Sequence, residues 1–163
     1  MSDTPRGRFL EDFVVGDRFQ HPIGRTLSEA DNTWFTLLTC NTNQIHFNSD
    51  FARQTEFGKP LINSCLTLAL VTGLSVDDIS LNLVANLGWD KVRLPAPVFA
   101  GDTIYAESEV LESRPSKSRP GQGIVRVRTR GYNQEGTVVI EFERSVLVYS
   151  RGAAPIWQRP SPP

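Results

Sequence analysis

The sequence predicts a single α+β domain in which an antiparallel sheet curls around one central buried helix. The first observation is the run LINSCLTLALVTGLSV at 61–76, which is apolar on nearly every side of a helix and therefore predicts a helix enclosed by protein. The second is a set of four later runs with strand-like alternation, separated by turns rich in Pro, Gly and Asn, at 83–94, 102–113, 123–133 and 137–149. These runs are expected to form an antiparallel meander.

The composition is that of one globular domain, and no nucleic-acid or membrane partner is expected. A chain of 163 residues with 39% hydrophobic and 21% charged residues is long enough to bury a core. Its net charge of -1 gives no field that would attract nucleic acid or anionic lipid. The N-terminus lacks the apolar segment of a secretion signal, and the longest apolar run is too short to cross a bilayer. We therefore expect a cytoplasmic protein.

The elements before the central helix follow from local signals. Residues 1–10 are expected to be a loose arm, and 16–28 to contain a short strand that ends at a Pro and Gly turn. Ser28 is placed to cap a helix over 28–39, which carries acidic residues in its first turn and Ala30, Trp34, Leu37 and Leu38 at helical spacing. Residues 41–60 have no sustained period and predict a loop with a helical turn at 49–54.

The third predicted strand carries a row of arginines on one face. Arg126, Arg128 and Arg130 could bind phosphate, but a hairpin loop at 133–136 would place Arg128 opposite Glu141 and Arg126 opposite Glu143. Exposed strand faces usually carry mixed charge, so we favour a solvated ladder of ion pairs.

The ends of the chain and the cysteines complete the domain prediction. The tail at 150–163 contains four prolines and cannot continue the sheet, although Ile156 and Trp157 are expected to dock on the body. No repeat or linker divides residues 1–163, so one domain is expected. Cys40 and Cys65 lie in apolar helical sequence without CxxC spacing, which predicts reduced thiols in the core and no metal site. His21 and Trp89 are expected to be structural.

The stretch TCNTNQIHFN at 39–48 is the strongest candidate for chemistry. It places Asn41 and Asn43 five and three residues before His46, one of only two histidines. Such a cluster is typical of loop capping, but imidazole, with an ordinary pKa of about 6.5, is also well matched to activating water at neutral pH. The residues alone leave both interpretations open.

Three segments together point to a known family. TCNTNQIHFN and FGKPLINSCL at 57–66 match the motifs SGDxNPxHxD and FGxPIxHGML, and LGWDKVRLPAPVFAGD at 87–102 matches a later family segment. The chain thus resembles, over about 16–149, the MaoC-like or hydratase 2 family of (R)-specific enoyl-CoA hydratases. The resemblance implies a hot-dog fold, an acyl-CoA thioester substrate, no separate cofactor, and a homodimer or higher oligomer with active sites at the subunit interface. A sheet with an open edge also favours dimerisation.

The resemblance assigns roles to particular residues. His46 is expected to be the base, Asn41 stands where the family has a catalytic aspartate, and the backbone N–H of Ser64 is expected to stabilise the thioester oxygen. Asn63 and Ser64 replace the family's histidine and glycine, and Gln44 replaces its proline. The residues expected to contact the substrate are Asn43, Asn63, Cys65 and Thr72. A buried Thr72 bonded to its own helix is an equal alternative.

The amide at position 41 bears on the substrate. An aspartate would repel a substrate carboxylate, whereas Asn41 can hydrogen-bond it. This favours short branched or dicarboxylic enoyl-CoA esters such as mesaconyl-CoA or itaconyl-CoA, and the chain also resembles the family branch that handles such acids. The alternatives are an acyl-CoA thioesterase, for which LINSCLTLAL at 61–70 lacks the usual carboxylate, and a non-catalytic acyl-CoA binding module.

Overall fold

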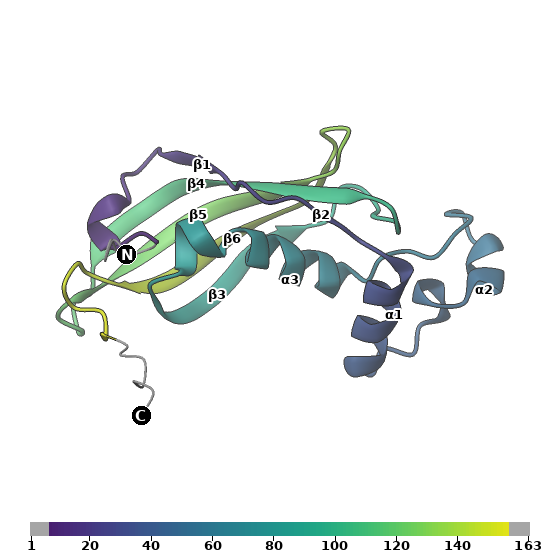
Figure 1. The fold of residues 1–163 in the computed structure, drawn as a ribbon, viewed down its shortest axis with the longest axis horizontal. Helices are drawn as coiled ribbons and strands as arrows, with labels where there is room; N and C mark the ends of the chain where they lie inside the picture. The colour runs from purple at the N-terminus through teal and green to yellow at the C-terminus, as the bar shows by residue number, and fades with distance from the viewer. Residues whose placement is uncertain (1–6, 157–163) are drawn as a thin grey trace, which may run out of the picture.

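A computed structural model describes residues 7–156 as one curved antiparallel sheet with a helix against its inner face (Figure 1). The strand order is β1-β4-β5-β6-β3, and β2 also pairs with β4. The strands are β1 (Arg18–Gln20), β2 (Arg25–Thr26), β3 (Leu83–Arg93), β4 (Thr103–Pro115), β5 (Gln122–Tyr132) and β6 (Val138–Tyr149). The helical elements are η1 (Leu10–Asp12), α1 (Glu29–Leu38), η2 (Gln44–His46), α2 (Ser49–Arg53), α3 (Ser64–Leu74) and the π turn η3 (Val76–Ser80). The predicted α+β class is confirmed.

All four predicted long strands are present, but the meander is only partly right. β4, β5 and β6 pair in sequence, whereas β3 pairs with β6 instead of β4. The connection from β3 to β4 contains Pro95 and Pro97, which have no backbone N–H to donate in a tight hairpin. The chain therefore passes from β3 across the width of the sheet to β4. β3 pairs only with β6 and is an edge strand.

Helix α3 is buried on one side only, which corrects the prediction of a helix enclosed on nearly every side. Thr67 and Val71 are buried, and the leucines of the helix are half-buried against a core cluster formed by Leu27, Ile62, Val71, Val98, Ile104, Ala106, Val139, Ile140 and Phe142. Cys65, Ala69 and Gly73 are exposed. One chain therefore leaves one side of this apolar helix uncovered.

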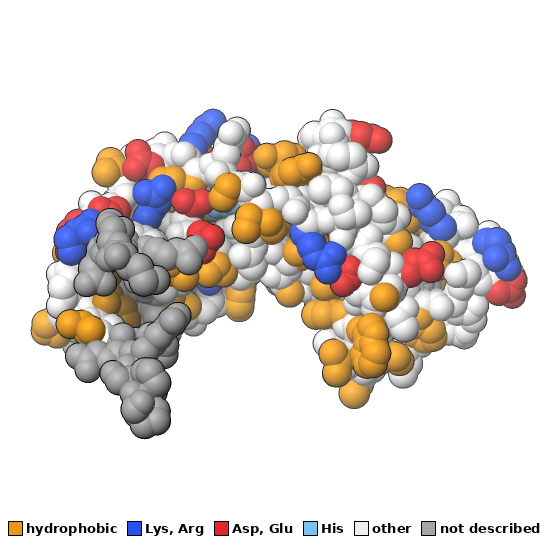
Figure 2. Space-filling view, in the orientation of Figure 1, with side chains coloured by type: hydrophobic (Ala, Val, Ile, Leu, Met, Phe, Trp, Pro, Cys, Tyr) orange, Lys and Arg blue, Asp and Glu red, His pale blue; other side chains and the backbone are white. Residues whose placement is uncertain are grey.

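Helix α1 begins as predicted, but its apolar residues face outward. Ser28 caps it in a capping box with Asp31, whose carboxylate accepts from the Ser28 backbone N–H at 2.8 Å. Hydrogen bonds from the Ser28 backbone and hydroxyl, and then from Arg25, lower the pKa of Asp31 to about 2. The buried side of α1 carries Asn32 and Thr36. The exposed side carries Trp34, Leu37 and Leu38. In Figure 2, hydrophobic side chains lie at the tip of the part of the molecule that contains α1, and a hollow separates this part from the sheet.

The arginine ladder is confirmed, with a different register. Arg128 lies opposite Glu143 and Arg130 opposite Glu141, two residues away from the predicted pairing. The hairpin loop covers 133–137, one residue longer than expected, and a bulge follows Gly131. The Asn133 carboxamide oxygen stabilises this longer loop by accepting two backbone N–H groups. Arg126 and Arg128 both approach the buried Glu143, and Lys91 donates to it at 2.9 Å, which lowers the pKa of that carboxyl.

Three smaller predictions need correction. Part of the N-terminal arm is packed, because Phe9 is buried and Leu10 lies against a second core cluster, which consists of Phe13, Ile79, Val110, Val125, Val127, Val146 and Val148. Ile156 is 88% exposed and does not dock, while Trp157 lies outside the described residues. Both cysteines are free but exposed, because Cys40 lies in the turn after α1 and Cys65 lies on the exposed side of α3.

His21 has the expected structural role. It is buried in the sheet face, with Nδ1 2.9 Å from Asp78 and Nε2 2.9 Å from the Ser108 hydroxyl. Trp89 is 43% exposed on edge strand β3. Within the described chain, no helix is long and apolar enough to cross a membrane.

The turn that ends α1 leads directly into the candidate active-site loop. Cys40 N–H donates to the Leu37 carbonyl and Asn41 N–H to the Thr36 carbonyl, which is the Schellman pattern of helix termination. Cys40 has φ 54, in the left-handed region that favours glycine. It occupies the glycine position of the SGDxNPxHxD motif, so the backbone geometry explains why that motif has glycine there.

Replacing Cys40 should therefore stabilise the protein. A side chain in the left-handed region costs about 1 kcal/mol, so Cys40→Gly should raise the free energy of unfolding by about that amount and Tm by about 2–4 °C. The thiol is exposed, so little packing is lost. Cys40→Ala removes the thiol but keeps the strain, and urea unfolding should show no comparable gain for it. Equal stabilisation by both variants would contradict this explanation.

Candidate active site

His46 ends the short helix η2, and its imidazole ring makes one hydrogen bond. Its Nδ1 lies 3.0 Å from the Leu61 carbonyl oxygen. A carbonyl oxygen only accepts, so Nδ1 must carry the hydrogen, and in the neutral ring the lone pair is on Nε2. Nε2 has no hydrogen-bond partner among residues 7–156. This half-buried imidazole is thus oriented by one nitrogen and has the other available to accept a proton.

The asparagines around His46 build the loop. The Asn41 side-chain oxygen accepts from the Asn43 backbone N–H at 3.0 Å, and the Asn43 side chain caps η2 by accepting from Ile45 N–H at 3.2 Å. Asn48 caps α2 in the same way. The capping interpretation of this stretch is therefore correct. It leaves the side-chain NH₂ groups of Asn41 and Asn43 without a hydrogen-bond acceptor in the described chain.

The start of α3 presents a backbone N–H group. Asn63 is the N-cap, and its side-chain oxygen accepts from Cys65 N–H at 2.9 Å. No acceptor for Ser64 N–H is found within residues 7–156. A helix N-terminus carries partial positive charge, so this N–H suits an anionic oxygen.

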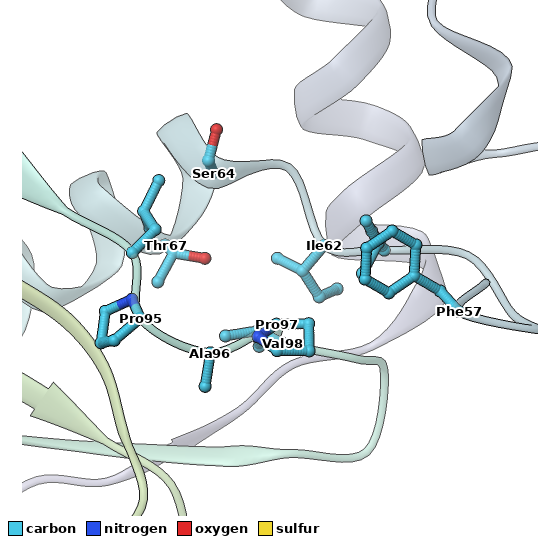
Figure 3. A pocket seen from close by; sticks show the side chains of 10 residues that line it. Phe57, Ile62, Ser64, Thr67, Pro95, Ala96, Pro97 and Val98 are labelled. Carbon is cyan, nitrogen blue, oxygen red and sulfur yellow. The ribbon is translucent and has the colours of Figure 1, made fainter. Parts of the chain in front are cut away.

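An apolar cavity of about 320 Å³ opens beside this helix terminus. Figure 3 draws the ten side chains that line it: Phe57, Leu61, Ile62, Ser64, Thr67, Leu94, Pro95, Ala96, Pro97 and Val98. The Ser64 hydroxyl points away from the Pro95–Val98 side chains, so it does not fill the cavity (Figure 3). The volume and lining suit the apolar part of a small ligand.

His46 lines a second, smaller cavity. This cavity of about 100 Å³ is bounded by Glu29, Asn32, Thr33, His46, Phe47, Ser49, Lys59, Pro60 and Ala100. Leu61 connects the two cavities, because its side chain lines the larger one while its carbonyl holds His46. The candidate base and the candidate oxyanion donor thus lie on either side of one extended segment.

Three further residues that were expected to contact the substrate lie away from both cavities. Asn63 is buried and its carboxamide is used as the cap, while the Cys65 backbone N–H is occupied by that cap. The Thr72 hydroxyl is buried and has no hydrogen-bond partner in the described part of the chain, so the alternative in which it bonds its own helix is wrong. None of these three residues lines either cavity.

Sequence reasoning missed three residues at the site. Asn32 is buried and contacts both His46 and Asn63, Thr67 lines the larger cavity, and Lys59 lines the smaller one. The available signal for Asn32 was its spacing with Thr36, which puts two polar residues on one side of a helix whose other side is apolar. Across residues 7–156, no group of His, Cys, Asp or Glu is arranged to hold a metal ion.

Known proteins resemble the chain in sequence. The MaoC like domain family matches residues 12–132. Mesaconyl-CoA hydratase from Cereibacter sphaeroides is 38% identical over 151 residues, which are 93% of this chain and 44% of that protein. (R)-specific enoyl-CoA hydratase from Rhodospirillum rubrum is 31% identical over 88% of this chain and 94% of its own length. The chain thus spans less than half of the first relative and nearly all of the second.

Solved structures resemble it in fold. A putative MaoC domain dehydratase from Chloroflexus aurantiacus superposes with a TM-score of 0.87 at 35% identity, covering 100% of this chain and 47% of that one. A Mycobacterium tuberculosis protein described as a double hotdog fold gives a TM-score of 0.80 at 23% identity, covering 94% and 47%. The hot-dog fold is therefore confirmed, and the chain belongs to the MaoC-like dehydratase family.

Proposed function

We propose that this protein is an enoyl-CoA hydratase that adds water to the double bond of a short enoyl thioester. The observation that carries the proposal is His46, whose Nδ1 donates to the Leu61 carbonyl and whose Nε2 is left to accept a proton, in a chain of the MaoC-like family. The cavity at the start of α3 supports it, because it offers an apolar space next to a backbone N–H.

The chemistry follows from these groups. Nε2 of His46 takes a proton from water, and the water oxygen bonds to the β-carbon. The double-bond electrons move to the α-carbon and the thioester oxygen, where Ser64 N–H and the helix terminus stabilise the negative charge. Asn41 cannot take a proton but can orient the water. The protonated His46 then returns a proton to the α-carbon, so the hydroxyl group and the proton add to the same face of the double bond.

A dicarboxylic C5 substrate such as mesaconyl-CoA is the preferred substrate class. The support is the 38% identity with a mesaconyl-CoA hydratase, together with the neutral amide of Asn41. Lys59 adds a positive charge to the cavity lined by His46, which suits a substrate carboxylate, although Glu29 lines the same cavity. A thioesterase is disfavoured because the first turn of α3 has no acidic residue.

A second hot-dog unit completes the proposed enzyme, and we take it to be a second copy of this chain. Three elements present exposed apolar side chains. They are Leu87, Trp89 and Val92 on edge strand β3, Cys65 and Ala69 on α3, and Trp34, Leu37 and Leu38 on α1. Exposed apolar surface of this extent, next to an open sheet edge, is typical of an interface. The relatives of double length are compatible with two such units acting together.

The assay that tests the function uses crotonyl-CoA, mesaconyl-CoA and itaconyl-CoA. The protein should remove enoyl absorbance while the thioester stays intact, and His46→Gln should lower turnover by roughly two to four orders of magnitude, the range for a positioned acid-base group. Release of free CoA would indicate a thioesterase, and binding without turnover a binding module. Wild-type turnover in a folded His46→Gln protein would refute the proposed mechanism.

Asn41→Asp tests the substrate preference. The carboxylate should favour crotonyl-CoA over mesaconyl-CoA, because like charges about 6 Å apart at an effective dielectric constant of about 20 repel by roughly 3 kcal/mol. The ratio of kcat/KM for the two substrates should shift by about ten-fold or more, and a ratio cancels general damage to the enzyme. An unchanged ratio, or a shift towards mesaconyl-CoA, would contradict the charge argument.

Sedimentation tests the assembly. At micromolar concentration the protein should sediment as a dimer or larger species, with no stable monomer. Trp89→Glu places a charge in the apolar surface of β3 and should produce monomers, whereas Trp34→Glu tests the separate surface on α1. A fully active monomer would show that the second copy is not required.

A further inference from the structure

We propose that Asn32 is the positioning residue of this active site, fixing the His46 imidazole in its Nδ1–H form and joining it to the start of α3. The inference rests on the proposed function, in which His46 is the base. Asn32 lies in the second turn of α1, is only 3% exposed, and was not identified from the sequence.

The Asn32 carboxamide uses both of its functional groups. Its NH₂ donates to the His46 backbone carbonyl at 2.7 Å and to the Leu61 carbonyl at 2.8 Å. Its oxygen accepts from Asn63 N–H at 2.8 Å. These bonds reach the loop of the base, the connecting segment and the N-cap of α3. One buried side chain thus joins three parts of the chain that carry the proposed chemistry.

The Leu61 carbonyl is the point at which Asn32 acts on His46. This one oxygen accepts from the Asn32 NH₂ and from His46 Nδ1. Asn32 therefore holds the acceptor that determines which imidazole nitrogen carries the hydrogen. If that carbonyl turns away, Nδ1 loses its acceptor, and the hydrogen can move to Nε2, where it would block proton uptake from water.

An asparagine is required because the position needs two donors and one acceptor at short reach. Aspartate at the same position could accept from Asn63 N–H but has no NH₂ for the two carbonyls. Its carboxylate would also face two carbonyl oxygens in a buried place. Asn32→Asp therefore keeps the shape of the side chain and removes the interactions that are proposed to matter.

The alternative is that Asn32 contributes only to stability, as most buried hydrogen-bonded side chains do. In that case a folded Asn32 variant would leave the His46 ring as it is, and kcat per folded molecule would not change. A measurement of the tautomer separates the two roles, since a stability effect does not select an imidazole nitrogen.

The experiment is a long-range ¹H–¹⁵N spectrum of the ¹⁵N-labelled protein at about pH 9, where an ordinary imidazole is neutral. The protein has only two histidines. His21, held by Asp78 and Ser108 on a different part of the sheet, serves as an internal reference. Wild-type His46 should show the Nδ1–H pattern. An Nε2–H pattern in the wild type would overturn the proposal without any variant.

The variants extend the test. In Asn32→Asp the His46 signals should move to a mixed or Nε2–H pattern, while those of His21 stay unchanged. Thr36→Val is the matched control, because Thr36 lies one turn further on the same side of α1 and its buried hydroxyl has no partner in the described chain. It should leave both histidines unchanged. A wild-type His46 pattern in folded Asn32→Asp would overturn the proposal. If Asn32→Asp does not fold, Asn32→Ser is judged by the same criterion.

Activity provides a second and separable readout. With the enoyl-CoA that the wild type hydrates best, Asn32→Asp should lower kcat by about 10²-fold, the effect of a small misplacement of a catalytic group, while KM changes little. Thr36→Val should keep wild-type kcat. If the wild type hydrates no enoyl-CoA, the proposed function fails, but the tautomer measurement still decides the role of Asn32. Wild-type kcat in folded Asn32→Asp would refute the role in positioning.

Discussion

The extended segment Leu61–Asn63 is the constraint on which the rest of the site depends. Leu61 N–H donates to the Ile45 carbonyl at 3.1 Å on one side, and Ile62 N–H donates to the Val98 carbonyl at 2.9 Å on the other. The segment thereby binds the loop of His46 to the proline-rich connection that forms the apolar cavity. Because Asn63 then begins α3, the direction of the helix terminus is set by the same hydrogen bonds.

This arrangement explains why the proposed catalytic groups come from loops and still have defined positions. Functional residues usually lie on loops that a rigid scaffold holds in place. Here the segment is held on one side through Val98 and on the other by Asn32, which is part of α1. Backbone hydrogen bonds hold the segment, and the side-chain oxygens of Asn41, Asn43 and Asn63 each accept one backbone N–H around it. Asn32 differs from them because its side chain bonds backbone groups at three places.

The sequence predicted the elements better than their arrangement. Strand alternation, the Ser28 cap and the turn residues are local signals, and the long strands and α1 appear close to their expected bounds. The pairing of β3 with β6 is not local, since it depends on the path of the Pro95–Pro97 connection, which runs past the start of α3. The ladder register differed because one additional loop residue and one bulge together shift every pair by two.

Site residues that stand at family motif positions could be predicted from the sequence. Site residues that are defined only by tertiary contacts could not. His46 and Ser64 stand at motif positions, and the structure places one beside each cavity. Asn32 could not be ranked above other polar helix residues, because its partners lie 14, 29 and 31 residues away in the chain. Whether the apolar side of α1 is covered could not be predicted either, for a physical reason. Helical spacing predicts an apolar side but not whether the same chain or another one covers it.

The described site is built mainly from carboxamides, and this has a consequence for its charge. Asn32, Asn43 and Asn63 each accept a backbone N–H through their oxygens, and they do so without adding a titratable group. The titratable side chains that line the cavity of His46 are Glu29 and Lys59, which carry opposite charge. The charged side chains around the His46 cavity therefore nearly cancel one another. Such surroundings do not oppose a substrate carboxylate with net negative charge, and this is the premise of the proposed preference for a dicarboxylic substrate.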